Sequence, residues 1–183
     1  TGPYEDLEGF LHRADEVALS LLDQGITGMK IWPFDGYAEA SNGMYISGSD
    51  LDRGLEPFRK IRAAVGNRID IMVEFHALWS LPMAQILCRE LEQFQPLWYE
   101  DPLRANNLDA LAELARGTRI PIAISETLST RWAFREALQA GAMGIAMVDV
   151  SWCGGISEAR KIATLAESFQ RPVMFHDCTG PVV

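Results

Sequence analysis

Ile71-Met72-Val73-Glu74 is a short apolar run followed by one polar residue with a functional group, and four later stretches repeat this arrangement. The residues that close the five runs are Glu74, Glu100, Glu126, Asp149 and His176, at intervals of 26, 26, 23 and 27 residues. A loop and an amphipathic segment follow each of the first four. This pattern is typical of a strand–loop–helix repeat. In a βα barrel the carboxyl ends of the strands meet on one face, which holds the active site.

The rest of the chain alternates in the same way. We expect strands at 28–32, 69–75, 97–100, 121–125, 144–149 and 172–176. We expect helices at 11–24, 51–65, 81–94, 107–116, 129–140 and 155–169. Residues 34–50 are rich in Gly, Ser, Asn and Asp and are expected to form a loop, with Asp50 as the N-cap of the next helix.

Strands that alternate with helices predict a parallel sheet, and nearly all-apolar strands predict burial on both faces. Six strands cannot close an eight-stranded barrel, which takes about 250 residues. The predicted fold class is therefore α/β, a TIM-like barrel that is incomplete at about six strands. The repeat length also suits a solenoid, but the repeats share no sequence signature, which disfavours that alternative. A doubly wound α/β binding domain, in which the carboxylates would not converge, stays open as an alternative.

Composition limits the class of protein. The chain has 183 residues, of which 48% are apolar, enough for one sizeable core. A net charge of −9 without a basic cluster argues against nucleic acid and anionic membrane as partners. No apolar run approaches the ~18 residues that span a bilayer, and we expect no secretory signal. Three widely spaced cysteines, Cys88, Cys153 and Cys178, favour a reducing, cytoplasmic setting.

The three glutamates form the strongest chemical signal. Any one of them alone could cap a helix or pair with a lysine. Three carboxylates that meet on one face repel one another unless a cation lies among them. Because no His or Cys belongs to the set, the pattern favours a hard cation, Mg²⁺ over Zn²⁺.

Two histidines are candidate proton carriers. Asp149 and His176 end adjacent strands, so Asp149 is expected to orient the imidazole and raise its basicity. The alternative is a helix-capping aspartate with a surface histidine. His76 comes two residues after Glu74, and strand alternation predicts that both side chains point the same way. His76 is then either a fourth metal ligand or an acid near the substrate.

Lys30 and Trp32 are candidate substrate-binding residues at the end of the first strand. Lys30 contacts a substrate carboxylate, or only extends its ammonium to the barrel rim. Trp32 lines the pocket, or packs in the core. Cys153-Gly154-Gly155 allows close backbone approach before the sixth helix, or only a tight turn. We assign Asp101 no chemistry.

The chain resembles the enolase superfamily in its mandelate racemase branch, and within it the acid-sugar dehydratases of the galactonate dehydratase type. Order and spacing match together over several segments. These are Val73-Glu74-Phe75-His76, Pro96-Leu97-Trp98-Tyr99-Glu100-Asp101-Pro102, Ile124-Ser125-Glu126-Thr127, Val148-Asp149-Val150-Ser151 with Gly154-Gly155-Ile156, and Phe175-His176 with Gly180-Pro181.

The resemblance implies a TIM-like barrel with an α+β capping domain. Residues 1–183 would then be a partial barrel domain that lacks the N-terminal capping domain and the last strand. It implies a carbon–oxygen lyase (hydro-lyase) with Mg²⁺ at Glu74, Glu100 and Glu126. An Asp149–His176 dyad would remove the proton α to a carboxylate, and His76 would help the β-hydroxyl leave, giving a 2-keto-3-deoxy acid. The expected partner is a small sugar acid, and we expect a homo-oligomer.

Two residues depart from the pattern of that branch. Glu74 stands where the first metal ligand is usually Asp. Trp32 replaces the second lysine of the Lys-x-Lys pair found in many racemases. This loss disfavours a racemase or epimerase of a 2-hydroxy acid, which would have to use His76 and His176 on opposite faces. A catalytically inactive barrel that binds a metal and an acid is the remaining alternative.

Overall fold

The computed structural model describes residues 5–177, apart from the side chain of Asp6. The predicted motif residues Cys178, Gly180 and Pro181 lie outside this range. Within it, no helix is both long enough and apolar enough to cross a bilayer.

A single parallel sheet of six strands organises the described chain, in the order β1-β2-β3-β4-β5-β6. The strands are β1 (Gly28–Ile31), β2 (Asp70–Glu74), β3 (Trp98–Glu100), β4 (Ile122–Ile124), β5 (Ile145–Asp149) and β6 (Val173–His176). Each strand pairs with the next one along the chain. Every observed strand end lies within one residue of its predicted position, so the predicted strands and the incomplete barrel are confirmed.

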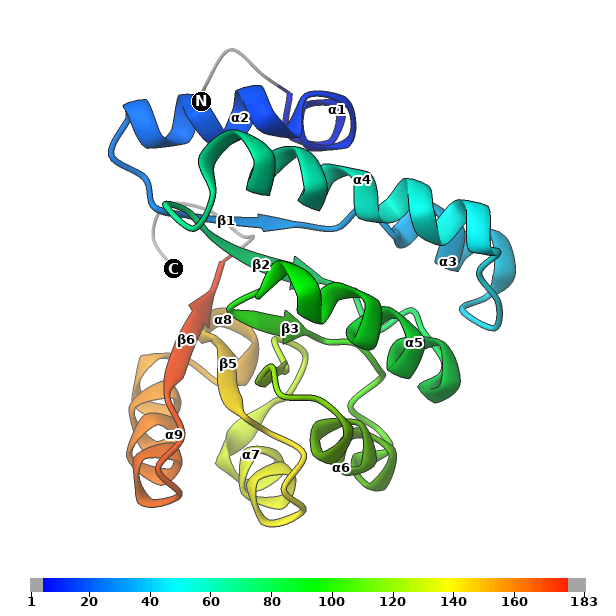
Figure 1. Ribbon diagram of the computed structural model, residues 1–183. Helices are drawn as coiled ribbons and strands as arrows, with labels where there is room; N and C mark the ends of the chain where they lie inside the picture. Colours follow the sequence, from blue (N-terminus) through cyan, green and yellow to red (C-terminus); the bar gives the residue numbers. More distant parts are fainter. Residues whose placement is uncertain (1–4, 178–183) are drawn as a thin grey trace.

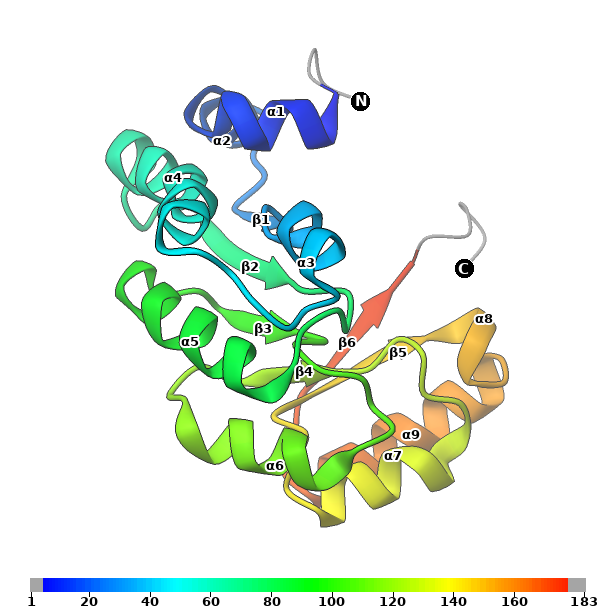
Figure 2. The same ribbon diagram turned by 90° about the vertical axis from the view of Figure 1, so that its right-hand side faces the viewer.

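Helices cover the convex side of the curled sheet, as Figures 1 and 2 show. They are α1 (Asp6–His12), α2 (Ala14–Asp23), α3 (Asp35–Ser41), α4 (Gly48–Val65), α5 (Leu81–Leu91), α6 (Leu108–Gly117), α7 (Thr130–Gln139), α8 (Val150–Cys153) and α9 (Ile156–Ser168). A 3-10 turn, η1 (Glu92–Phe94), extends α5. This arrangement turns the concave side of the sheet inward, as in a barrel.

The two faces of the sheet carry different residues because side chains alternate along each strand. The convex-face residues, such as Ile71, Val73 and Tyr99, join the main core beneath the helices. The concave side has a second, smaller apolar cluster of Trp98, Ala123, Ile145 and Met147. The carboxyl ends of the strands therefore project their concave-face polar residues above an apolar floor.

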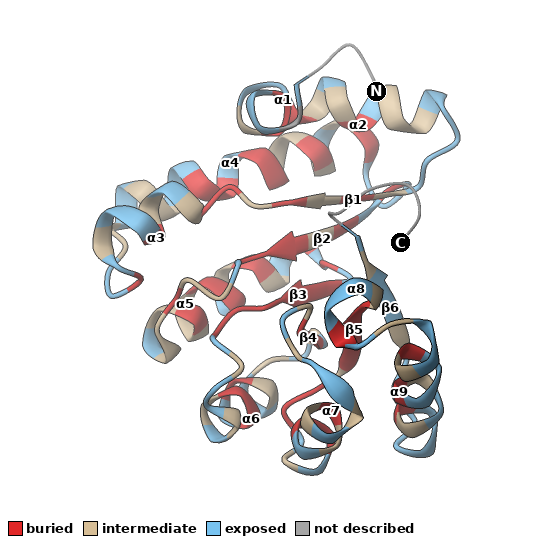
Figure 3. Ribbon diagram, turned by 180° about the vertical axis from the view of Figure 1, so that it is seen from behind, coloured by how far each residue is buried: buried red, intermediate tan, exposed pale blue. Residues whose placement is uncertain are grey.

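Burial on both faces holds for the central strands but is wrong for β6 (Figure 3). Met174 is 40% exposed and Phe175 is 64% exposed. The reason is position, because within residues 5–177 no strand pairs with the outer edge of β6. An apolar sequence predicts a strand, but neighbouring strands decide whether it is covered.

The predicted loop at 34–50 is wrong in part, because residues 35–41 form α3. This segment contains Tyr37, Ala38, Glu39 and Ala40, which tolerate a helix, while the surrounding Gly and Asn residues dominate the composition. Asn42 ends α3 in a left-handed conformation, with φ of 51°. The predicted cap of α4 is also wrong: Ser47, not Asp50, is the N-cap, and its hydroxyl accepts a hydrogen bond from the Asp50 amide.

The predicted helix at 11–24 is two helices, since α1 ends at His12 and α2 begins at Ala14. Arg13 between them has φ of −133° and ψ of 42°, which is not helical. The apolar spacing continues through this break because both helices bury one face against the same core. The apolar periodicity therefore predicts which face of the two helices is buried, but it does not predict the break at Arg13.

Candidate active site

Three glutamates gather at the carboxyl end of the sheet. Glu74 and Glu100 end neighbouring strands and are register partners. Glu126 lies two residues beyond the end of β4. One carboxylate oxygen from each of the three lies within 4.8 Å of the others. Glu74 and Glu100 are buried, so their mutual repulsion is only weakly screened by water.

Lys30 supplies positive charge to this cluster. Its Nζ donates to Oε1 of Glu100 at 2.6 Å and to Oε2 of Glu74 at 3.1 Å. Burial lowers the pKa of Lys30, but the charges of Glu100 and Glu74 together outweigh burial and raise it. The ammonium therefore stays charged, and it is engaged by protein carboxylates rather than free for a substrate.

Further donors fix the orientation of each carboxylate. Oε1 of Glu74 accepts from the backbone amides of Phe75 and His76, at 3.0 and 2.8 Å. Oε2 of Glu100 accepts from the indole Nε1 of Trp98 at 2.9 Å. Oε1 of Glu74 is thus hydrogen-bonded to backbone amides, and Oε2 is the oxygen that faces Lys30 and the cluster.

The donor set suits a hard cation. All three groups offer carboxylate oxygens, which Mg²⁺ and Ca²⁺ prefer as ligands. Burial raises the pKa of Glu100, the charge of Glu74 raises it further, and Lys30 acts in the opposite direction. One ammonium cannot neutralise three carboxylates, so the cluster retains a net negative charge that a divalent ion would balance.

Asp149 and His176 end adjacent strands and are register partners. Oδ2 of Asp149 lies 2.9 Å from Nδ1 of His176. Oδ1 of Asp149 accepts from the amides of Ser151 and Trp152, at 2.8 and 3.1 Å, and so caps α8. The capping role and the contact with the imidazole were expected to exclude each other, but Asp149 has one oxygen for each.

The second nitrogen of His176 faces the glutamate cluster. Nε2 lies 3.0 Å from Oε2 of Glu126. His176 thus bridges an aspartate, which fixes one nitrogen, and a glutamate of the proposed metal site. The ring also lies near the indole of Trp152, with 5.7 Å between ring centroids. A proton accepted at Nε2 would arrive beside the carboxylate cluster.

His76 does not continue the strand alternation, so alternation is not the reason that its side chain lies near Glu74. β2 ends at Glu74, and His76 has a left-handed φ of 49°. Its Nδ1 lies 2.7 Å from Oδ2 of Asp35, and this hydrogen bond raises the pKa of His76. Burial opposes that rise, and the charges of Glu74 and Glu126 add to it, so the imidazole does lie near the cluster.

Trp32 packs edge-on against Phe10, with ring centroids 4.7 Å apart, and edge-on against His76 at 5.9 Å. Trp32 therefore contacts the core at Phe10 and the candidate site at His76. This position is compatible with both sequence interpretations of Trp32, and its role in substrate binding stays a prediction.

Sequence reasoning missed several site residues. Trp98 stands two residues before Glu100 on the same strand face, so alternation could have found its hydrogen bond. Asp101 was assigned no chemistry, yet it is buried and accepts from Ser125 Oγ at 2.8 Å. Burial raises the pKa of Asp101 well above its usual value. Its Oδ1 has no hydrogen-bond partner among the residues that the structure describes.

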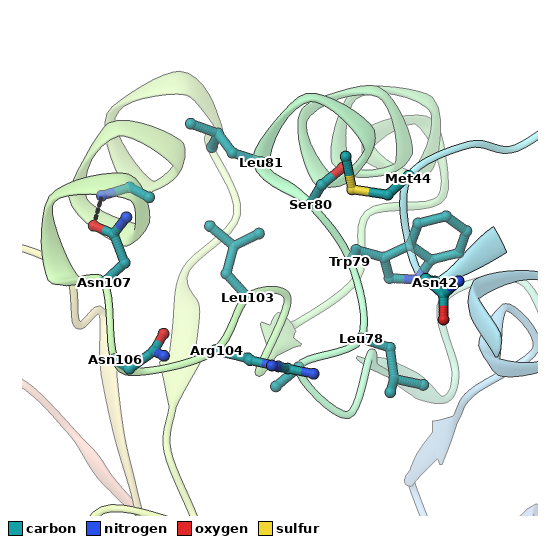
Figure 4. Close-up of a pocket in the computed structure, with 12 residues that line it drawn as sticks. Asn42, Met44, Leu78, Trp79, Ser80, Leu81, Leu103, Arg104, Asn106 and Asn107 are labelled. Atoms are coloured by element: carbon teal, nitrogen blue, oxygen red, sulfur yellow. Dashed lines mark hydrogen bonds between the residues drawn. The ribbon is translucent and has the colours of Figure 1, made fainter.

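A cleft of about 360 Å³ opens beside the site, between the loops that follow β2 and β3 (Figure 4). Ala77, next to His76, is one of its lining residues, and Arg104 extends from the opposite loop toward Leu78. None of the three glutamates, Asp149 or His176 lines it. The cleft adjoins the site without containing its charged groups.

Comparison with known proteins agrees with this geometry. The chain is 37% identical over 140 residues to a D-galactonate dehydratase from Ralstonia nicotianae, and the match covers 76% of this chain and 37% of that protein. It is 34% identical over 170 residues to one from Xanthomonas axonopodis pv. citri, covering 93% of this chain and 44% of that protein. The chain thus spans less than half the length of these relatives.

Solved structures show the same fold. An enolase of the mandelate racemase subgroup from Agrobacterium tumefaciens is 55% identical, with a TM-score of 0.91 over 93% of this chain and 47% of that chain. An enolase from Sargasso Sea environmental sequencing is 48% identical, with a TM-score of 0.89 over 91% of this chain and 46% of that chain. A model of the enolase C-terminal domain-like family matches residues 13–183. The predicted resemblance is confirmed, and the chain belongs to the enolase C-terminal domain-like family.

Proposed function

We propose that the protein containing this chain is a Mg²⁺-dependent hydro-lyase that dehydrates a sugar acid. One observation carries the proposal: two histidines, each hydrogen-bonded to its own aspartate, lie near three glutamates at the carboxyl end of the sheet. Dehydration next to a carboxylate needs a base, an acid and charge compensation. The arrangement offers one candidate for each requirement.

His176 is the proposed base. Nε2 accepts the proton from the carbon α to the substrate carboxylate, and the electrons of the broken C–H bond move toward that carboxylate. Asp149 holds Nδ1 and stabilises the imidazolium that forms. Because Oε2 of Glu126 lies 3.0 Å from Nε2, this contact has to open before the substrate can reach the base.

His76 is the proposed acid. As the electrons return to form a carbon–carbon double bond, the bond between the β-carbon and its hydroxyl breaks. His76 gives a proton to the departing oxygen, which leaves as water. The resulting enol takes a solvent proton at the former β-carbon and becomes a 2-keto-3-deoxy acid. The overall reaction is the loss of one water, with no oxidant or reductant.

Glu74, Glu100 and Glu126 are the residues that would hold Mg²⁺. When bound, the ion supplies positive charge that offsets the negative charge developing on the substrate carboxylate. Their oxygen-only donor set supports this assignment, as does the presence of three carboxylates against the single ammonium of Lys30. Glu74 would contribute through Oε2, because backbone amides engage its Oε1.

The relatives support the substrate class. Two proteins at 34–37% identity are D-galactonate dehydratases, which makes D-galactonate the first sugar acid to test. A cytoplasmic setting and a homo-oligomer stay predictions. The described cysteines, Cys88 and Cys153, are buried and not disulfide-bonded, which agrees with a reducing environment.

The test is a screen of the full-length protein against aldonic and aldaric acids, with semicarbazide detection of keto products. We expect keto acid from at least one compound in the presence of Mg²⁺, and none after chelation. Exchange of the α-proton for deuterium with no keto product would favour a racemase or epimerase instead. Binding without exchange or product would indicate an inactive barrel.

A further inference from the structure

Asp35 is the first residue of α3, and its carboxylate reaches a histidine 41 positions away. Oδ2 lies 2.7 Å from Nδ1 of His76. An ionised carboxylate can only accept, so Nδ1 carries the hydrogen. The other oxygen, Oδ1, is buried and has no hydrogen-bond partner within residues 5–177. The contact with His76 is therefore the one side-chain hydrogen bond of this carboxylate among the residues that the structure describes.

Two stacked aromatic rings hold the backbones of Asp35 and His76 in place. Phe34 precedes Asp35, Phe75 precedes His76, and both phenylalanines are fully buried. Their ring centroids are 6.2 Å apart with an interplanar angle of 22°. Because each polar residue follows a fully buried aromatic residue, core packing sets the distance between the two backbones.

The far end of α3 is attached to the loop that follows His76. The carbonyl of Gly43 accepts from the amide and the hydroxyl of Ser80, at 3.0 and 2.9 Å. A Cβ on Gly43 would lie 1.9 Å from the carbonyl oxygen of Leu78, so the two backbones touch here. Figure 4 shows Asn42 beside Trp79 at this junction. α3 is thus held against the His76 loop at both ends.

The backbone at His76 is itself constrained. His76 and Ala77 have φ of 49° and 57°, an uncommon conformation for residues with side chains. The amide of His76 donates to Glu74 at 2.8 Å, and that of Ala77 donates to the carbonyl of Asp101 at 2.6 Å. Strained conformations persist where the surroundings determine them, and they cluster at functional sites.

We propose that Asp35 is the positioning residue of His76 in the elimination step. Asp35 holds Nδ1, which leaves Nε2 as the ring nitrogen that meets the departing hydroxyl of the substrate. Within residues 5–177, Nε2 of His76 has no hydrogen-bond partner, while Trp32 contacts the ring edge-on. This inference rests on the proposed dehydratase function. It adds a second Asp–His pair, formed from α3 and the β2 loop, to the pair at Asp149.

The experiment compares two rates in the full-length protein: formation of keto acid and exchange of the substrate α-proton in D₂O. Asp35→Ala should lower keto-acid formation at least tenfold more than it lowers α-proton exchange, since exchange proceeds through His176. Asp35→Asn, which can still hydrogen-bond to Nδ1, should lose less than Asp35→Ala. Glu39→Ala, on the exposed face of α3, is the matched control and should keep both rates.

Keto-acid formation at the wild-type rate in Asp35→Ala would overturn the proposal. So would an equal loss of both rates in a variant that unfolds at the wild-type temperature. The pair can also be tested without turnover, by NMR of protein carrying ¹⁵N-labelled histidine. The Nδ1–H signal removed by His76→Asn should also disappear in Asp35→Ala and persist in Glu39→Ala; persistence in Asp35→Ala contradicts the proposal. If wild-type protein forms no keto acid from any sugar acid, the dehydratase assignment fails, whereas the NMR result still decides the pair.

Discussion

The ammonium of Lys30 lies between Glu100 and Glu74, 2.6 Å from Oε1 of the first and 3.1 Å from Oε2 of the second. These are two of the three carboxylates that would hold the metal. Lys30 thus compensates part of their negative charge. A cation bound by the same carboxylates would be repelled by the ammonium, because like charges in a partly buried site interact strongly.

Lys30→Met should therefore act in opposite directions on stability and on metal affinity. We expect the metal-free variant to unfold at a lower temperature, because two buried carboxylates lose their partner. We expect Mn²⁺ to bind about tenfold more tightly, equivalent to ~1.4 kcal/mol. Titration followed by electron paramagnetic resonance measures this affinity. Lys161→Met, on an exposed position of α9, is the control. Weaker Mn²⁺ binding in Lys30→Met would show that the lysine assists the metal instead.

Trp98→Phe tests the support of Glu100. The change keeps an aromatic ring on the concave face but removes the indole donor at 2.9 Å from Oε2 of Glu100. Loss of such a supporting hydrogen bond typically lowers metal affinity about 10–100-fold. The same Mn²⁺ titration measures it, and Trp132→Phe at an exposed position serves as the control. Equal affinities for the two variants would mean that the indole does not orient this ligand.

Asp149→Asn separates the two functions of Asp149. The amide oxygen can still accept from Ser151 and Trp152, so the cap of α8 and the unfolding temperature should change little. The amide nitrogen cannot accept from Nδ1 of His176, so the imidazole loses its orienting charge. We expect α-proton exchange to fall by about 10²-fold or more. Asp109→Asn, exposed on α6, is the control, and unchanged exchange in Asp149→Asn would rule out the dyad.

Asp101 should make stability depend on pH. Burial raises the pKa of Asp101 in the folded state. Below the unfolded-state pKa of about 3.9, Asp101 is protonated in both states and does not make the free energy of unfolding depend on pH. As pH rises above that value, the unfolded state ionises first and stability falls. The Asp101→Asn variant does not lose stability in this way, because asparagine does not ionise. Its unfolding temperature relative to wild type should therefore rise between pH 4 and pH 7, and a constant difference would contradict the assignment.

The sequence could predict those site residues that lie at strand ends and follow the alternation of side chains along a strand. Glu74, Glu100, Asp149 and His176 lie at or next to strand ends on one face, as the repeating apolar runs indicated. The pairing of Asp35 with His76 could not be predicted. It joins residues 41 positions apart, through a helix hidden in a polar segment and a left-handed backbone that breaks the alternation.

The bond between Asp101 and Ser125 escaped prediction for a related reason. It joins two loops after neighbouring strands, and their approach depends on the pairing of β3 with β4. Sequence periodicity gives the face of each strand but not the register between loops. Buried polar groups in such loops become visible only when the sheet is assembled.

In the reaction that we propose, His176 removes the α-proton and His76 then releases the hydroxyl. The most direct test follows the full-length wild type and His76→Asn by ¹H NMR in D₂O, with a sugar acid that the wild type converts. Wild type should yield a 2-keto-3-deoxy acid with one deuterium at the former β-carbon. His76→Asn should exchange the α-proton and form no keto acid. Keto-acid formation by His76→Asn at the wild-type rate would contradict the account.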